Sequence, residues 1–505
     1  MLYQGSVFFW MRSFSVGGFL CVLDKSRAFR FLGLDKPEKS AIIQMGLQFT
    51  PWKEGGLVKV KEVDMLSCPV TKGLFAMAFP IILMNVFQQL FNTIDMTVLG
   101  EYAGDTAVGA VGVCGVYIAL FFGLVNGLAT GTNIVISRYL GLRERERAER
   151  TIGTSMISGL FVGFLLFAIG VLLARPLLLM VDCDAQLLGE ATRYFRLYFC
   201  SLPACVLYLF SNSVLRARGE TRLPMIYLMI GAAAKVVLNF VFVAGLGMNV
   251  DGVAYATILS NVITAMLTFR AVYKMEGSMR FYWKNMRIFR QELGQILATG
   301  VPVGVEQMLY SCANLAILAV VNGYGPDTTT GYTISLQFNN IIYNVCVCTS
   351  FAVMPFVAQN AGAGNFTRVR EIMRKSVLLT TVLGGGCGWL FAIFSRPLAS
   401  LMSKSPAVID IAAKQIVLIS GLYFICGIAY ALNAVLRGLG RPIIPTISSM
   451  LFMFAFRFLW VWFVYPLCPN IVFLYTVWPV SWVFCSLTGL AFCLPTVRRL
   501  EKKTS

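Results

Sequence analysis

The chain has 505 residues, of which 57% are hydrophobic and only 13% are charged, and its mean hydropathy is +0.73. Soluble globular proteins carry about a quarter charged residues, so this composition excludes an ordinary soluble domain and indicates a polytopic membrane protein. The formal net charge is +18, but the basic residues fall in short clusters between apolar runs, which favours membrane topology over nucleic-acid binding. The chain contains no histidine, so any proton chemistry would use carboxylates or lysine.

Residues 1–64 do not match the pattern of the rest. They contain a short semi-apolar run that Arg12 interrupts, as in a signal peptide or an amphipathic anchor. We expect instead that translation begins at Met65. The preceding Lys61-Glu62-Val63 can be encoded as AAG GAG GTG, which resembles a bacterial ribosome-binding site, and the codons themselves would test this expectation.

Twelve apolar runs follow, each long enough to cross a hydrocarbon core of roughly 30 Å. Lipid offers no hydrogen-bond partners to the backbone, so such runs must form helices. We predict an all-α polytopic membrane protein with spans at 74–99, 106–132, 153–174, 194–214, 224–246, 252–273, 293–321, 329–355, 376–395, 413–435, 446–466 and 471–494.

The chain also repeats itself. VLRARGETRLPMI at 214–226 returns as VLRGLGRPIIPTI at 435–447, an offset of 221 residues, and Gly141 matches Gly362 at the same offset. Pro80 matches Pro302 one residue further on. A near-constant offset over such a distance indicates an internal duplication, and an even number of spans in each half makes the halves parallel repeats. The predicted organisation is an extension at 1–64, an N lobe at 65–273, a linker at 274–292, a C lobe at 293–495 and a basic tail at 496–505.

Lys and Arg concentrate in the even-numbered loops and after residue 495, including RERERAER at 143–150 and RVREIMRK at 368–375. The positive-inside rule then places these loops and both mature ends in the cytoplasm, with the chain as a multi-pass protein of the cell membrane. Arg216 and Arg437 close the repeated turns on this side, and we interpret them as structural anchors rather than substrate-binding residues.

Three stretches carry a family resemblance. FPIILMNVFQQLFNTIDMTVLG at 79–100, the turn VLRARGETRLPM, and FVAQNAGAGNFTRVR at 356–370 together resemble the multidrug and toxic compound extrusion (MATE) family over roughly residues 70–495. The resemblance implies two six-helix lobes around a central cleft. It also implies alternating-access export of an organic cation against an inward flow of protons or sodium ions.

The same resemblance implies a transporter rather than an enzyme, with no cofactor beyond the coupling ion. The expected partners are a cationic, amphipathic small molecule and membrane lipid, with no nucleic acid and no obligate protein partner.

The ion-coupling candidates begin with Asp95, near the end of the first span. The resemblance implies that this aspartate lines the N-lobe cavity and takes part in cation coupling. Lys235 and Asn239 stand four residues apart in the fifth span, on one helix face, where related transporters commonly have Asn and Asp. Because a lysine replaces part of that possible cation site, an N-lobe sodium site is in doubt. We hypothesise that Asp95 and Lys235 form a proton-sensitive pair; a salt bridge that never titrates is the alternative.

Glu306, in the seventh span, is predicted to be a lone acid in the C lobe. Some family members use a glutamate in this span for sodium or substrate, whereas their aspartate of the tenth span has no counterpart here. A hydrogen bond from a neighbouring helix is the structural alternative.

Polar residues also recur at helical spacing inside apolar spans. They either line the substrate cleft or hold helices together, at about 0.6 kcal/mol each. The candidates are Gln88, Gln89, Asn92, Asn126, Gln307, Gln337, Asn340 and Asn344.

Two other transporter classes are weighed. A flippase or exporter of a lipid-linked or other amphipathic metabolite is the main alternative, and the cationic Lys235 keeps it open. A major-facilitator carrier would also have twelve spans, but the loop YLGLRERER lacks that family's GxxxDxxGRR signature. No phosphate loop or nucleophile elbow indicates ATP-driven transport or catalysis.

Overall fold

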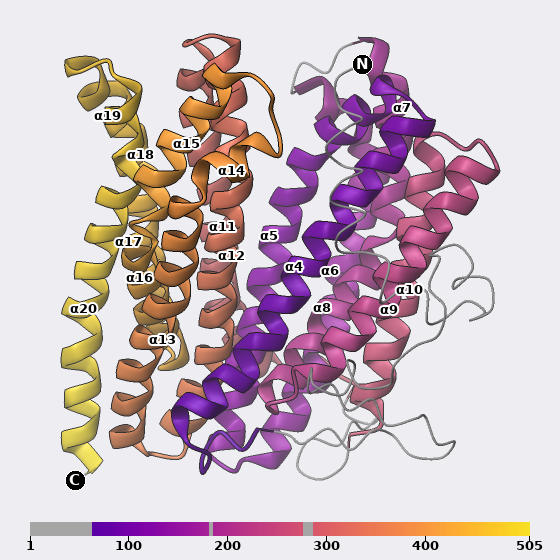
Figure 1. Cartoon of the computed structure of the whole chain (residues 1–505). Coiled ribbons are helices and arrows are strands. Elements are labelled where there is room, and N and C mark those ends of the chain that lie inside the picture. Colours follow the sequence, from indigo (N-terminus) through magenta and orange to yellow (C-terminus); the bar gives the residue numbers. More distant parts are fainter. Residues whose placement is uncertain (1–62, 181–184, 276–285, 505) are drawn as a thin grey trace, which may run out of the picture.

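The computed structural model describes residues 63–180, 185–275 and 286–504, and every regular element in these ranges is helical (Figure 1). Most of the extension at 1–64 and part of the linker at 274–292 lie outside the described residues. The N-terminal half contains α4 (Val70–Tyr102), α5 (Asp105–Gly141), α6 (Arg145–Met180), α7 (Ala185–Cys200), α8 (Leu202–Ala217), α9 (Arg222–Asn239), the π-helical turn η2 (Phe240–Gly245) and α10 (Val250–Tyr273).

The C-terminal half repeats this plan beside the first, and Figure 1 shows the two halves as adjacent bundles. It contains α11 (Arg290–Asn322), α12 (Pro326–Gly362), α13 (Phe366–Ile393), α14 (Ser395–Ser400), α15 (Pro406–Ser420), α16 (Tyr423–Gly438), α17 (Ile443–Ser449), η4 (Met450–Ala455), α18 (Phe456–Leu459), η5 (Trp460–Val464), η6 (Tyr465–Leu467), α19 (Ile471–Tyr475) and α20 (Val477–Thr504).

Ten helices of the described chain are long and apolar enough to cross a membrane, and two bent pairs, α7–α8 and α15–α16, bring the number to twelve. Each pair bends by 44° at its break. These pairs coincide with the spans predicted at 194–214 and 413–435. Several helices run past the apolar segments that predicted them: α5 reaches Gly141, α12 reaches Gly362, and α20 continues through the predicted tail. Hydropathy detects only the part of a helix that lies in lipid, so it underestimates helices that extend into the interface.

The repeated phrase forms the same turn in both lobes. Gly219 follows α8 with a φ of +92°, and Gly440 follows α16 with a φ of +75°. A residue with a Cβ rarely adopts this left-handed conformation, so glycine ends both helices.

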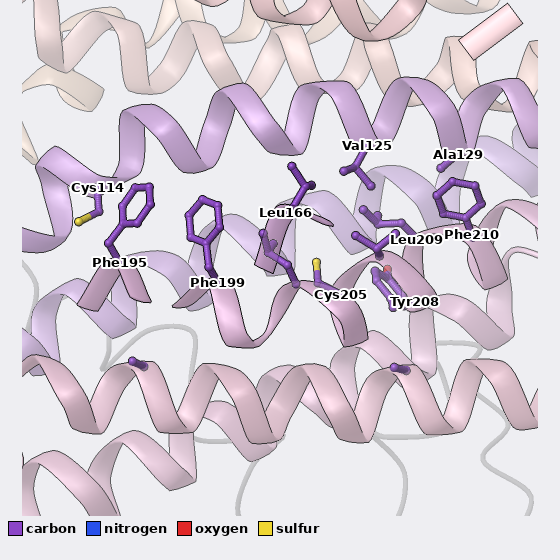
Figure 2. Close-up of a cluster of buried hydrophobic side chains, with 14 of the residues drawn as sticks. Cys114, Val125, Ala129, Leu166, Phe195, Phe199, Cys205, Tyr208, Leu209 and Phe210 are labelled. Atoms are coloured by element: carbon purple, nitrogen blue, oxygen red, sulfur yellow. The ribbon is translucent and has the colours of Figure 1, made fainter. Parts of the chain in front are cut away.

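The core of the N lobe is built from aromatic and aliphatic side chains of α5, α6, α7, α8 and α10. Phe195 and Phe199 of α7 stack with ring centroids 4.3 Å apart, and the Tyr117 ring meets Phe195 edge-on. Figure 2 shows these phenylalanines side by side next to Leu166 and Cys205. This packing holds the bent α7–α8 pair against α5, whose opposite face meets the C lobe.

The lobes meet through glycines on α5 and α11. Gly127 and Gly131 of α5 face Gly300 and Gly304 of α11 so closely that a Cβ at Gly131 would lie 2.6 Å from the carbonyl oxygen of Ile296. Small residues let helix backbones approach in lipid, where dispersion forces rather than water exclusion drive association. The α5–α11 contact therefore sets the distance between the lobes.

A second contact closes one end of the bundle, where α5 and α12 finish. The repeat-related Gly141 and Gly362 pack on each other's helix, and a Cβ on Gly141 would collide with the Gln359 carbonyl. The Gln359 amide Nε2 also donates to the Ala217 carbonyl at 2.7 Å. These contacts close the end that carries the basic loops.

We expect Gly141→Val to loosen this end, because overpacking a tight contact typically costs about 1–3 kcal/mol. Hydrogen–deuterium exchange of segments 138–143 and 359–364 should rise. Gly112→Val is the matched control, because Gly112 lies on the same helix, is exposed, and has no heavy atom within 4 Å of a built Cβ. Equal exchange at 359–364 in Gly141→Val and Gly112→Val would contradict the conclusion that the contact between Gly141 and Gly362 closes this end of the bundle.

Candidate functional site

A cavity of about 640 Å³ lies between the lobes, a volume typical of small-molecule sites. Its wall comes from α4, α5, α7 and α8 of the first half and from α11, α12, α16 and the α17–η4 segment of the second. The polar residues predicted from helical spacing that line it are Gln88, Gln89, Asn92, Asn126, Gln307 and Asn344.

Two predicted substrate-cleft residues do not belong to this wall. Gln337 and Asn340 have exposed side chains and lie outside the lining of the cavity. They stand nearer the start of α12 than Asn344, whose Nδ2 donates to the Asn340 carbonyl at 2.8 Å. Helical spacing placed them near Asn344, but it did not determine how far along the helix the cavity reaches.

Tyrosines make up an apolar side of the cavity that sequence analysis missed. Tyr310 and Tyr343 stack with ring centroids 5.0 Å apart, and the Tyr430 ring stands edge-on to Tyr343 at 5.7 Å. The Tyr430 hydroxyl donates to the Tyr343 hydroxyl at 3.1 Å. All three residues line the cavity, so the wall offers a ring surface to a planar or apolar ligand.

The three N-lobe coupling candidates form one buried cluster. The Lys235 ammonium pairs with Oδ2 of Asp95, and Asn239 Nδ2 donates to Oδ1 at 2.5 Å. The side chains of Asp95 and Lys235 are 9% and 19% exposed, and Asn239 is fully buried. The expected contact between Asp95 and Lys235 is therefore present, and Asn239 joins it because residues four apart share a helix face.

This cluster is separate from the central cavity. Asp95 of α4 contacts Lys235 and Asn239 of α9 and is not among the residues that line the central cavity; its expected place in a cavity within the N lobe stays a prediction. Lys235 and Asn239 occupy both of its carboxylate oxygens. The cluster consequently links two helices of one lobe instead of contacting a ligand in the cavity.

Glu306 has a partner on a neighbouring helix, which is the structural alternative that the sequence left open. Its carboxylate pairs with the guanidinium of Arg437 from α16, and the two side chains are 10% and 5% exposed. Both residues line the cavity. The position expected for Arg437 at the membrane interface is corrected: its side chain turns inward, where the buried Glu306 carboxylate offsets the cost of burying its charge.

Arg216, the repeat mate of Arg437, also lines the cavity. Its Nε donates to Asn212 Oδ1 at 2.9 Å, and its guanidinium lies 5.7 Å from the centre of the Phe351 ring. Among the described residues, no acidic side chain pairs with it. Arg216 was expected to be a structural anchor, and its hydrogen bond to Asn212 agrees with that role. Its guanidinium also lies at the wall of the cavity, which the sequence did not predict.

Arg457 on α18 is a further cation that sequence analysis missed, although it falls inside the span predicted at 446–466. It is fully buried, and its guanidinium donates to Asn314 Oδ1 at 3.1 Å and to Ser481 Oγ at 3.3 Å. It lies 5.3 Å from the centre of the Tyr310 ring. Within the described chain no carboxylate neutralises it. The sequence signal that could have identified Arg457 was the presence of an ionisable residue inside a predicted span.

Neither Asp95 nor Glu306 belongs to a cluster of ligands typical of a metal-cation site. In the described ranges no group of three or more His, Cys, Asp or Glu side chains could hold a metal ion. Asp95 and Glu306 each face a basic side chain, whose positive charge opposes a bound cation.

Comparison with known proteins agrees with this architecture. The MatE family model matches residues 80–241 and again residues 302–463, once in each lobe. The chain is 26% identical to the probable multidrug resistance protein YoeA of Bacillus subtilis (strain 168), over 74% of this chain and 82% of that protein. It is 23% identical to a protein of Shewanella oneidensis named FAD transporter, over 76% and 86% of the two chains.

The fold matches a solved structure described as an outward-facing multidrug resistance MATE family transporter of the MOP superfamily. The TM-score is 0.81 at 19% identity, and the match covers 88% of this chain and 99% of that one. The two family-model matches together span more than half of the sequence. The chain therefore belongs to the MATE family of multidrug efflux transporters.

Proposed function

We propose that the protein is a secondary active antiporter that exports amphipathic small molecules by alternating access of its two lobes, with Asp95 as the coupling group. The observation that carries this proposal is the buried cluster of Asp95, Lys235 and Asn239. An ionisable group within a membrane span is costly, about 2.5–3.5 kcal/mol on insertion scales, so its presence indicates a function. Asp95 and Lys235 form the one described ion pair between α4 and α9.

The coupling step follows from the charges of the cluster. With Asp95 ionised, the pair is neutral and holds α4 to α9. A proton on Asp95 removes one charge and leaves the Lys235 ammonium unpaired, so that the contact between the helices weakens. A proton that arrives from one side and leaves to the other would thus shift the lobe between two arrangements.

Protons fit this cluster better than sodium ions. A sodium site needs several oxygen ligands free of competing cations, whereas Lys235 and Asn239 occupy the Asp95 oxygens and Arg437 occupies Glu306. Proton coupling is therefore the form of antiport that we propose.

The direction of transport rests on the predicted orientation. If the basic loops are cytoplasmic, the contact between Gly141 and Gly362 closes the cytoplasmic end, and the cavity belongs to an outward-facing state. In this scheme the lobes separate at Gly141 and Gly362 when the cavity next receives substrate.

A flippase or exporter of a lipid-linked or other amphipathic metabolite is the second candidate. Relatives named for multidrug resistance and for FAD show that names within this family differ in substrate. The basic wall residue Arg216 favours this alternative. The cationic charge expected of the substrate stays a prediction.

The test uses the full chain in liposomes with imposed proton or sodium gradients. Two xanthene dyes of opposite charge, a rhodamine ester and fluorescein, serve as substrates. We expect a proton gradient to drive accumulation of at least one dye and a sodium gradient to have no effect. Dye movement driven by sodium alone would contradict proton coupling, and no movement under either gradient from folded protein would favour the flippase.

A further inference from the structure

The two lobes carry basic side chains at matching positions but acidic side chains at different ones. The family matches begin at residues 80 and 302, an offset of 222, and Arg216 matches Arg437 at 221. Lys235 of α9 and Arg457 of α18 stand 222 apart. The π-helical turn η4 precedes Arg457, whereas α9 is regular up to Lys235, and a π turn adds one residue, which accounts for the change of offset.

Each lobe lacks a different acid. At the offset of 222, Glu306 of the C lobe corresponds to Met84, so the N-lobe Arg216 has no acid in the place where Arg437 has one. Likewise Asp95 corresponds to Ile317, which is fully buried, so Arg457 has no acid in the place where Lys235 has one. Each lobe thus holds one neutral pair and one arginine without a carboxylate.

The hydrogen bonds around Met84 support this correspondence. Arg216 donates to Asn212, Asn212 Nδ2 donates to the Tyr208 hydroxyl at 3.3 Å, and that hydroxyl donates to the Met84 sulfur at 3.7 Å. The chain of contacts ends on a thioether, a weak acceptor that carries no charge. The positive charge of Arg216 therefore remains uncompensated.

The cavity as a whole is consequently positive. Among the described lining residues, only Arg216, Glu306 and Arg437 carry a charge, and the last two neutralise each other. Arg457 adds a second positive charge directly behind the Tyr310 ring. In a site of low dielectric constant, these charges repel an organic cation and attract an anion.

We propose that the central cavity binds an amphipathic organic anion, whose carboxylate, sulfonate or phosphate group pairs with Arg216. Its apolar part lies on Phe351 and on the rings of Tyr310 and Tyr343. The proposal rests on the transport function above, since it assigns the substrate class of the same cavity, and it replaces the cationic substrate that the family resemblance implies.

The experiment measures equilibrium binding without any ion gradient, so that a failure of coupling does not affect it. Fluorescein, an anion, and a rhodamine ester, a cation on the same ring system, are titrated against the full chain in nanodiscs of zwitterionic lipid. Fluorescence anisotropy reports binding. We expect wild-type protein to prefer fluorescein by about tenfold or more, in line with the loss or gain of one buried charge pair.

Two substitutions test Arg216 from opposite directions. Arg216→Gln removes the charge, and Met84→Glu restores the acid that the C lobe has at Glu306. Each should weaken fluorescein binding by about tenfold or more and leave rhodamine unchanged or tighter. Met84→Gln is the matched control for Met84→Glu, with a similar length and no charge. If Arg216→Gln fails to fold, the difference between the two Met84 variants decides the question.

Two outcomes would overturn the proposal. One is a wild-type preference for rhodamine, and the other is an equal loss of fluorescein binding in Met84→Glu and Met84→Gln. Nanodiscs that contain phosphatidylglycerol distinguish the source of the anion. Competition by this lipid would identify a lipid headgroup as the natural anion, and no competition would identify a soluble one.

Discussion

Asp95→Asn is expected to stop ion-driven transport and to destabilise the N lobe. The asparagine cannot cycle a proton, and it leaves the Lys235 ammonium, 19% exposed, without a carboxylate. Removing one partner of a buried pair typically costs about 3–5 kcal/mol. Dye accumulation in proteoliposomes under a proton gradient should fall to the level of empty vesicles. Unfolding in detergent with increasing SDS should show the loss of stability.

A second substitution separates coupling from folding. Asp95→Asn combined with Lys235→Met removes both charges, so most of the lost stability should return while transport remains absent. If Asp95 and Lys235 form only a structural salt bridge, the double variant would instead recover transport along with stability. Glu101→Gln is the control on the same helix, because Glu101 is an exposed acid near the end of α4.

Glu306→Gln is expected to be the most destabilising change in the C lobe. It leaves the Arg437 guanidinium buried at 5% exposure without its acid, at a cost of about 3–5 kcal/mol. Glu306→Gln combined with Arg437→Met should recover most of this loss, because neither charge then remains. The measurement is the SDS concentration at half-unfolding of the purified protein.

The repeat offers the matched control for this prediction. Arg216→Gln removes the arginine that corresponds to Arg437 in the other lobe. Unlike a break of the Glu306–Arg437 pair, it leaves no charged partner without its counter-charge in the described chain. It should cost about 1 kcal/mol, the value of one hydrogen bond and one cation–π contact. Equal losses for Glu306→Gln and Arg216→Gln would show that the Glu306–Arg437 pair contributes nothing beyond a hydrogen bond.

Much of the fold follows from local properties of the sequence. Spans such as 252–273 and 329–355 could be predicted because an apolar segment in lipid has no alternative to the helix. The duplication could be predicted because the same turn, with its glycine at positive φ, recurs after α8 and α16. The contact between Asp95 and Lys235 could be hypothesised because charges inside spans are rare and must find partners.

The partners of the other buried charges could not be predicted in this way. Glu306 and Arg437 are 131 residues apart, and nothing near either residue specifies the other. Gln337 and Asn344 share a helix and a polar character, yet only Asn344 lines the cavity. Both outcomes depend on how each helix is rotated and shifted against its neighbours.

The amino-acid sequence by itself determined the class of protein, the number of spans, the repeat and the acids Asp95 and Glu306 inside the spans. The class, the spans and the cost of the intramembrane acids follow from the transfer of residues or segments between water and lipid, whereas the repeat follows from the recurrence of the same residues at a near-constant offset. Only the tertiary structure decided which charges neutralise each other and which face the cavity. That outcome depends on helix packing at contacts such as Gly127 with Gly304, because close approach of two backbones decides which side chains come within reach of each other.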